Sequence, residues 1–169
     1  AYVWQFLTDK DRIVRDRLEQ ALLEKVPDWD VAFGTVSLDL SGTARLSDVT
    51  LRLRDREGSL VHVPELVATL DRDLLTRSQM LRIERITLHE PTVWVSRDAA
   101  GSWNWQSLTP PPESDAACPE INIVRGTIVV HSARTDQLPE TEFSCRSVDG
   151  RLVPSGHRRY AVRIVTDVD

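Results

Sequence analysis

The sequence predicts a mainly β (α+β) fold in which one N-terminal amphipathic helix covers part of a long, curved antiparallel sheet. The spacing of apolar residues is that of a helix before Pro27 and changes to the two-residue alternation of strands after it. Many short strand signals then follow at regular intervals with turn residues between them, which is typical of antiparallel sheets. A chain of 169 residues with 41% hydrophobic content has the size and composition of one domain.

The predicted helix spans about 17 residues and ends at Pro27, because proline cannot continue a helix. Thr8 is placed to cap its first turn, and Asp11 stands three residues later in the position of a capping box. Its apolar residues recur at steps of three and four, so they form one stripe that would cover the sheet. This stripe consists of Val14, Leu18, Ala21 and Leu22.

Residues 1–7, AYVWQFL, are apolar and aromatic and precede the first charged residues. Trp and Tyr gather where a transmembrane helix emerges into water. We therefore expect either that a membrane anchor precedes this chain or that these side chains pack against the folded body. No run of about 18 apolar residues occurs in the sequence itself, so it holds no segment that would span a bilayer as a helix.

After Pro27 the alternation of apolar and polar residues changes phase between Ile83 and Ile86, which predicts a β-bulge near Glu84-Arg85. About ten strands spaced about 4.8 Å apart would form a sheet about 45 Å long. A helix of about 17 residues is only about 25 Å long and covers part of such a sheet. Either the sheet curls until its own side chains close the core, which the pattern alone favours, or something else fills an uncovered apolar trough.

No motif points to catalysis or to a metal site. Neither GxSxG nor GxxxxGK occurs, and the four histidines, His62, His89, His131 and His157, lie far apart in the sequence. The net charge of -5 leaves no basic excess for nucleic acid. We therefore expect no catalytic residue, no metal ion, no cofactor and no nucleic-acid partner.

Two residue pairs leave alternatives open. Trp103 and Trp105 share a strand parity, so they would form either a sugar-stacking platform or, as we favour, the seal of a sheet edge or turn. Cys118 and Cys145 lack the spacing of a zinc site. They form either a disulfide, in an oxidising compartment, or two unrelated thiols.

Several segments follow one another in a recognisable order between Arg15 and Leu108. The helix is followed by strands with VSLDL (36–40), ARLSDVTL (44–51) and VPELVATLD (63–71), and then by IERITLHEPTV (83–93) and RDAAGSWNW (97–105). This ordered set resembles the N-terminal region of the AsmA-like family, which is related to TamB and to the chorein-type bridge lipid-transfer proteins. The family's transmembrane anchor and long C-terminal remainder have no counterpart in these 169 residues.

The resemblance implies a repeating β-groove, which is a half-pipe whose apolar concave face holds acyl lipid and whose end the N-terminal helix caps. It implies a periplasmic location at a bacterial inner membrane, and a part in intermembrane phospholipid transport or outer-membrane lipid homeostasis. The implied partners are phospholipid or another acyl lipid, the inner membrane through the anchor, and further β-groove units or envelope proteins at the C-terminal edge. The concave face is predicted to consist of Val36, Leu38, Leu40, Val49, Leu51, Leu53, Leu66, Ala68, Leu70, Leu81, Ile83, Val93 and Val95.

The Pro-rich break at residues 110–115 and the same resemblance together suggest the domain organisation. We expect residues 1–110 to hold the helix and the first β-groove unit, residues 111–118 to be a Pro-rich linker, and residues 119–169 to begin a further unit that is cut short. Two other functions remain open. One is a structural or assembly module for envelope biogenesis, whose sheet is closed by its own core or by a protein partner. The other is a carbohydrate-active enzyme or lectin-like domain that uses Trp103 and Trp105.

Overall fold

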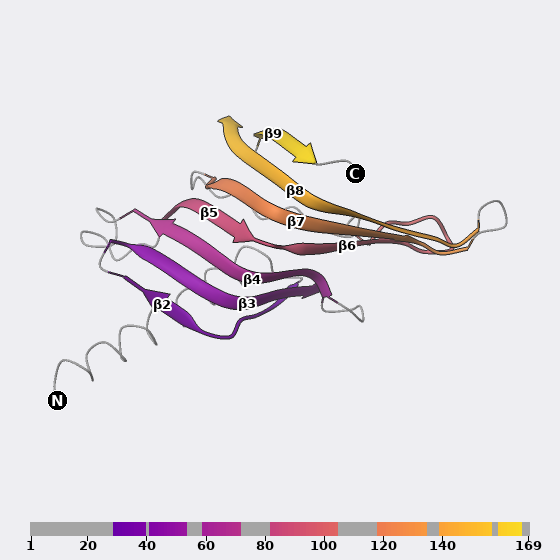
Figure 1. Ribbon diagram of the computed structural model, residues 1–169, viewed down its shortest axis with the longest axis horizontal. Helices are drawn as coiled ribbons and strands as arrows, with labels where there is room; N and C mark the ends of the chain where they lie inside the picture. Colours follow the sequence, from indigo (N-terminus) through magenta and orange to yellow (C-terminus); the bar gives the residue numbers. More distant parts are fainter. Residues whose placement is uncertain are drawn as a thin grey trace.

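The computed structural model describes residues 29–39, 41–53, 59–71, 82–104, 118–134, 139–156 and 159–166. These residues form one nine-stranded sheet, so the prediction of a mainly β chain is confirmed (Figure 1). The predicted helix with its stripe of Val14, Leu18, Ala21 and Leu22 and residues 111–117 of the predicted linker lie outside the described residues. The strands are β1 (Trp29–Ala32), β2 (Val36–Leu38), β3 (Thr43–Leu53), β4 (Ser59–Leu70), β5 (Ile83–His89), β6 (Thr92–Arg97), β7 (Glu120–Ser132), β8 (Thr141–Gly156) and β9 (Arg159–Thr166).

The nine strands lie along seven lines across the sheet, which we call strand lines: β1 and β2 share one line, and β5 and β6 share another. The sheet runs in the order β1-β3-β4-β5-β7-β8-β9, with β2 also beside β3 and β6 also beside β4 and β7. β1 and β2 pair with β3 in one continuous register, and β5 and β6 pair with β4 in one register that shifts only between Thr69 and Leu70. Each of these pairs is therefore a single strand line whose ladder is interrupted once.

The expectation of a purely antiparallel sheet is wrong, because β7 runs parallel to both β5 and β6. A parallel neighbour needs a connection long enough to return the chain to the edge where the previous strand began. The sequence between Asn104 and Cys118 is longer than a hairpin turn, and β7 begins beside Arg85, near the start of β5. The predicted bulge is confirmed: Thr69 pairs with Arg85 but Leu70 pairs with Ile83, so Glu84 is the extra residue.

Four non-glycine residues have a positive φ: Asp48 (50°), Glu90 (52°), Arg125 (54°) and Ser147 (53°). L-residues visit this left-handed region rarely, and a residue placed there breaks the two-residue alternation of a strand.

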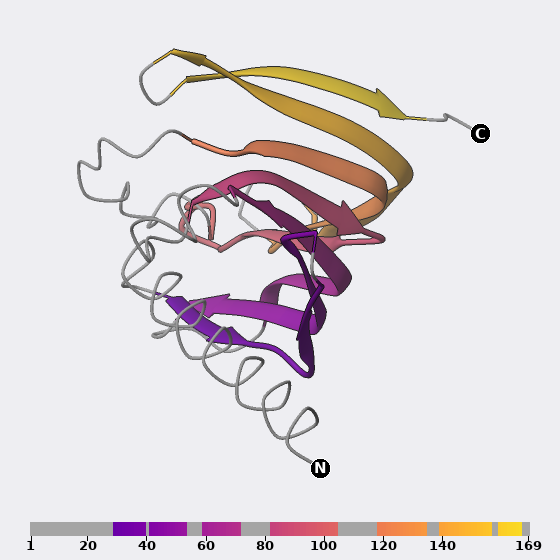
Figure 2. The same cartoon turned by 90° about the vertical axis from the view of Figure 1, so that its left-hand side faces the viewer.

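The register places the four residues at one level across the sheet. Asp48 lies level with Pro64, Glu90 follows His89, which pairs with Glu65, and Arg125 follows Val124, which pairs with His89. Ser147 adjoins Val148, the partner of Gly126. On the first strand line Gly34 occupies this level, where its N–H donates to the Ser47 carbonyl at 2.8 Å. We call this transverse level the crease; Figure 2 shows that the long strands bend midway and that the sheet is strongly curved.

The crease keeps apolar side chains on one face of the sheet on both of its sides. In β3 the buried residues Leu46 and Val49 are three positions apart across Asp48, and in β4 Val63 and Leu66 are three apart across Pro64. A regular strand would have sent the second member of each pair to the opposite face. The core lies on β3 and β4 and consists of Ala44, Leu46, Val49, Val63, Ala68 and Leu70, each at most 3% exposed.

Candidate functional site

One face of the sheet carries rows of apolar residues that run across the strand lines, and two of the three rows cross all seven. Each row consists of residues that are paired neighbours in the ladder, so its members share a face. The first row consists of Val36, Leu46, Leu66, Leu88, Ile123, Gly150 and Ile164. The second consists of Leu38, Ala44, Ala68, Ile86, Ile121, Leu152 and Val162. On the other side of the crease a third row consists of Val31, Leu51, Val61, Val93, Ile128 and Cys145.

We call the surface formed by these three rows, together with the neighbouring apolar residues of the same face, the apolar face. Its exposure changes along the sheet. On β3 and β4 the core members Ala44, Leu46, Val49, Val63, Ala68 and Leu70 are buried, whereas on β8 and β9 Phe143 is 53%, Val162 58% and Ile164 57% exposed. The accessible part of the apolar face therefore lies at the C-terminal edge of the sheet.

The predicted site residues that the structure describes fall on this face, and three of them are buried. Leu40 and Leu81 lie outside the described residues. Val49, Ala68 and Leu70 are at most 3% exposed, so they are already covered. The remaining predicted residues, Val36, Leu38, Leu51, Leu53, Leu66, Ile83, Val93 and Val95, are partly exposed.

Sequence reasoning missed the accessible residues of β8 and β9 as site residues. The sequence did signal strands at Phe143, Val162 and Ile164, but the alternation there is short and broken by Pro154. The signal that would have found them is the shared parity of Leu152, Val162 and Ile164, which continues the two rows above.

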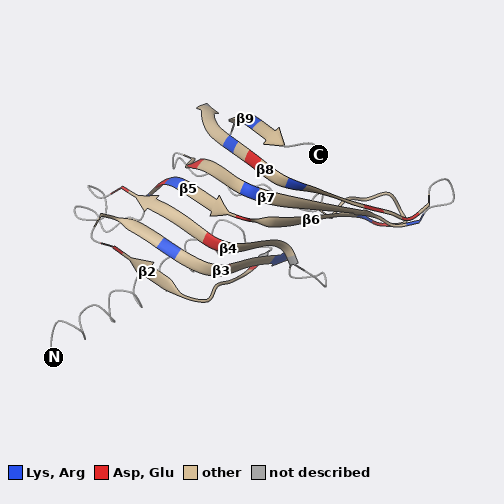
Figure 3. Cartoon of the chain, viewed as in Figure 1, with Lys and Arg blue, Asp and Glu red and all other residues tan. Residues whose placement is uncertain are grey.

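The opposite face carries polar side chains in the matching positions, and Figure 3 shows charged residues at isolated places along the strands. One row of this face consists of Ser37, Arg45, Val67, Thr87, Asn122, Arg151 and Arg163. The sheet is therefore amphipathic, with one apolar and one largely polar surface.

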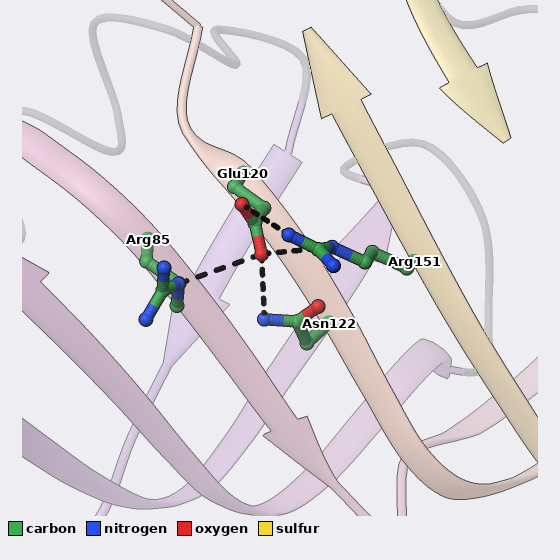
Figure 4. A network of polar contacts seen from close by, with 4 residues as sticks. All are labelled: Arg85, Glu120, Asn122 and Arg151. Carbon is green, nitrogen blue, oxygen red and sulfur yellow. Dashed lines mark hydrogen bonds and ion pairs between the residues drawn. The ribbon is translucent and has the colours of Figure 1, made fainter. Parts of the chain in front are cut away.

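A four-residue network ties β5, β7 and β8 together on this polar face (Figure 4). Arg151 donates from Nε to Glu120 Oε1 at 3.1 Å and from Nη2 to Oε2 at 3.2 Å. Arg85 Nε lies 3.5 Å from the same carboxylate, and the Asn122 amide donates to it at 3.2 Å. The hydrogen bond from Arg151 holds the pKa of Glu120 below its ordinary value of 4.5. This carboxylate is fully used in joining strands, which is a structural role.

No group of three or more metal-ligating side chains occurs in the part of the chain that the structure describes. His62 lies 3.9 Å from Asp48 and His131 lies 3.0 Å from Glu140, each as a single pair. The same described residues contain no helix long and apolar enough to cross a bilayer.

Trp103 takes part in a closed turn after β6. The Arg97 guanidinium lies 5.8 Å from its ring centre, and Arg97 Nε donates to the Gly101 carbonyl at 3.1 Å. The buried Asn104 amide donates to the Trp94 carbonyl at 2.9 Å. Trp105, the other half of the proposed sugar platform, lies outside the described residues. Trp103 therefore helps to close the turn that follows β6.

Both cysteines are free. Cys145 pairs with Ile128 in the second half of β7, whereas Cys118 precedes the first residue of that strand. A disulfide needs Cα atoms within about 7 Å, and several strand residues at about 3.3 Å each separate the two positions. Of the two alternatives, the structure has two unrelated thiols.

Comparison of the chain with protein-family models, with curated proteins and with solved structures gives no match to any of them.

Proposed function

We propose that the apolar face binds acyl lipid, and that the chain is a non-catalytic β-groove domain of a membrane-anchored envelope protein. Its task would be intermembrane phospholipid transport or outer-membrane lipid homeostasis, on the periplasmic side of a bacterial inner membrane. The observation that carries the proposal is an apolar surface that crosses all seven strand lines without interruption and is more than half exposed at β9. The resemblance of the sequence to AsmA-like proteins supports the same function.

In this proposal the bent strands form the walls of a half-pipe, the crease runs along its base, and the N-terminal helix caps one end. The exposed members of the apolar face at the C-terminal edge, Phe143, Val162 and Ile164, then contact acyl chains. Complete burial of one CH₂ group contributes about 0.8 kcal/mol, and a chain lying on an open face gains only part of this per group. Such a lipid is held along its tails while its headgroup stays in water, and it can still exchange.

The alternative is a structural or assembly module whose sheet is closed by its own core or by a protein partner. One observation favours it for the N-terminal half of the sheet: Ala44, Leu46 and Val63 are at most 2% exposed. A closed core at β3 and β4 leaves no room for lipid there. The two functions therefore make different predictions only for β8 and β9.

The decisive experiment is lipid extraction and native mass spectrometry of the purified protein and two matched variants. Val162 and Ile164 lie on the apolar face, and Val165 lies on the opposite face of the same strand with 51% exposure. We expect copurified phospholipid in the parent protein, its loss in the double variant V162E/I164E, and its retention in V165E. All three positions are more than half exposed, so none of the variants should unfold the domain.

A parent protein without lipid, or equal lipid content in both variants, contradicts the proposal. Leu38→Glu provides a second comparison, because Leu38 packs against the buried core. The closed module is the better description if two results occur together. Leu38→Glu unfolds the domain, and both the parent protein and V162E/I164E are folded and carry no lipid.

A further inference from the structure

The outer edge of β9 is unpaired in the described part of the sheet. β9 is the last strand line, and within the described ranges no other strand pairs with its outer side. Natural edge strands are usually protected by proline, by several charges or by bulges. Between Tyr160 and Thr166 the sequence has no proline, and Arg163 is its one charged residue. An exposed edge of this kind accepts further strands readily.

Apolar residues of this edge are exposed on both faces of the sheet. Val162 and Ile164 are 58% and 57% exposed on the apolar face, and Val165 is 51% exposed on the opposite face. Val153, in the adjoining strand, is 37% exposed. A lipid bound to the apolar face cannot reach Val165. An added strand can cover both faces, because its side chains alternate between them.

The charge at this edge is also uncompensated. Arg163 pairs directly with Arg151 across the ladder, and like charges placed opposite each other destabilise a sheet. Glu120 binds the Arg151 guanidinium through both of its oxygens, whereas no ion pair joins Arg163 to any carboxylate of the described residues. An open depression of about 480 Å³ beside Arg163 is lined by Arg151, Asn122 and Val165 among others, and also by Asp149, whose Oδ1 accepts a hydrogen bond from the Arg125 N–H.

We propose that β9 accepts an extended strand from a partner polypeptide, with apolar side chains beside Val162 and Ile164 and a carboxylate opposite Arg163. The carboxylate would offset the like-charge pair and enter the depression. A symmetric pairing of two copies through β9, centred on this residue, would instead place Arg163 against Arg163. In this register an acidic strand therefore suits Arg163 better than a second copy of β9. This inference rests on the edge and on the polar face, and it does not depend on lipid binding.

The test uses two fluorescently labelled peptides with the sequence of residues 159–166, one unaltered and one carrying Arg163→Glu. In antiparallel pairing centred on this position, the Glu peptide places its carboxylate opposite Arg163 of the protein and its Val and Ile side chains beside Ile164 and Val162. Binding to the whole protein and to its R163E variant is measured by fluorescence anisotropy. R163E places a carboxylate opposite Arg151, so the variant is expected to fold.

We expect the parent protein to bind the Glu peptide about three- to tenfold more tightly than the unaltered one, and R163E to reverse this preference. N-methylation of alternate peptide nitrogens, on the side that faces β9, should abolish binding, because strand addition uses backbone hydrogen bonds. Equal affinities in all four combinations, or unchanged binding of the methylated peptide, would overturn the proposal. Sedimentation showing that the parent protein pairs with itself through β9 would overturn it as well. Lipid content should not differ between the parent and R163E, so a failure here is distinguishable from a failure of the proposed function.

Discussion

Glu90 and Arg125 lie next to each other on adjacent parallel strand lines, and both have a positive φ, 52° and 54°. Their side chains form an ion pair with 2.7 Å between Glu90 Oε1 and Arg125 Nη2. The Glu90 N–H donates to the Val124 carbonyl at 2.8 Å, and the Arg125 N–H donates to Asp149 Oδ1 at 2.8 Å. The crease is thus fixed by backbone and side-chain contacts at the point where β5 ends and β6 begins.

The first prediction concerns backbone strain at the crease. Ser147 is exposed and has a φ of 53°. We expect Ser147→Val to lower the free energy of unfolding by about 1–2 kcal/mol, because a β-branched residue is strained in the left-handed region. Ser147→Gly should be neutral or stabilising by up to about 1 kcal/mol. Urea denaturation measures both values.

Ser144→Val is the matched control for this prediction. Ser144 is also exposed on β8, but its φ is not positive, so a β-branched residue suits it. Equal costs for valine at positions 144 and 147 would show that the crease carries no special backbone requirement.

The second prediction concerns the close approach at Gly126. A Cβ at this position would lie 3.0 Å from Ile123 Cγ2 and 3.3 Å from Pro91 Cγ. We expect Gly126→Ala to cost about 1–3 kcal/mol through overpacking, measured by chemical denaturation. Gly150→Ala is the control, because its Cβ would have ordinary contacts of 3.4 Å or more, to Ile123 and others. If the two substitutions lower the free energy of unfolding by the same amount, the close approach at Gly126 does not destabilise its alanine variant.

Much of the sheet was predictable because local alternation reveals which side chains share a face. The phase change near Glu84 is one example, since the bulge that it predicts is present in the ladder. Val36, Leu51 and Val93 were assigned to the apolar face from alternation within their own short segments, and the register places them there.

The crease and the parallel pairing of β7 were not predictable in the same way. Glu90, Arg125 and Ser147 are not residue types that favour a positive φ, so the sequence alone gives no warning of the bend. The direction of β7 depends on where a long connection returns to the sheet, which residue patterns do not encode. The exposure of Val162 and Ile164 depends on what covers each end of the sheet, which alternation does not report.

The third prediction concerns acid stability. The pKa of Glu120 is lowered from 4.5, chiefly by the hydrogen bond from Arg151. A carboxyl group with a lowered pKa in the folded state stabilises the protein above its ordinary pKa, and this contribution is lost as the pH falls through the folded value. Glu120→Gln should therefore destabilise the protein at pH 7 and lose this effect well below pH 4.5. Urea midpoints measured across this range test it, and a penalty independent of pH contradicts it.

The fourth prediction concerns alkaline stability. Tyr160 donates its hydroxyl proton to the Pro119 carbonyl at 3.1 Å, and burial together with Cys118 raises its pKa from 10.0 to about 12. A raised pKa favours the neutral phenol in the folded state, so its stabilising contribution is complete below pH 10 and disappears as the pH rises towards 12. We expect the ultraviolet absorbance of tyrosinate to show one late-titrating group that is absent in Tyr160→Phe. If Tyr160→Phe changes neither the tyrosinate titration nor the loss of stability at alkaline pH, the contact between Tyr160 and the start of β7 does not control the alkaline stability of the protein.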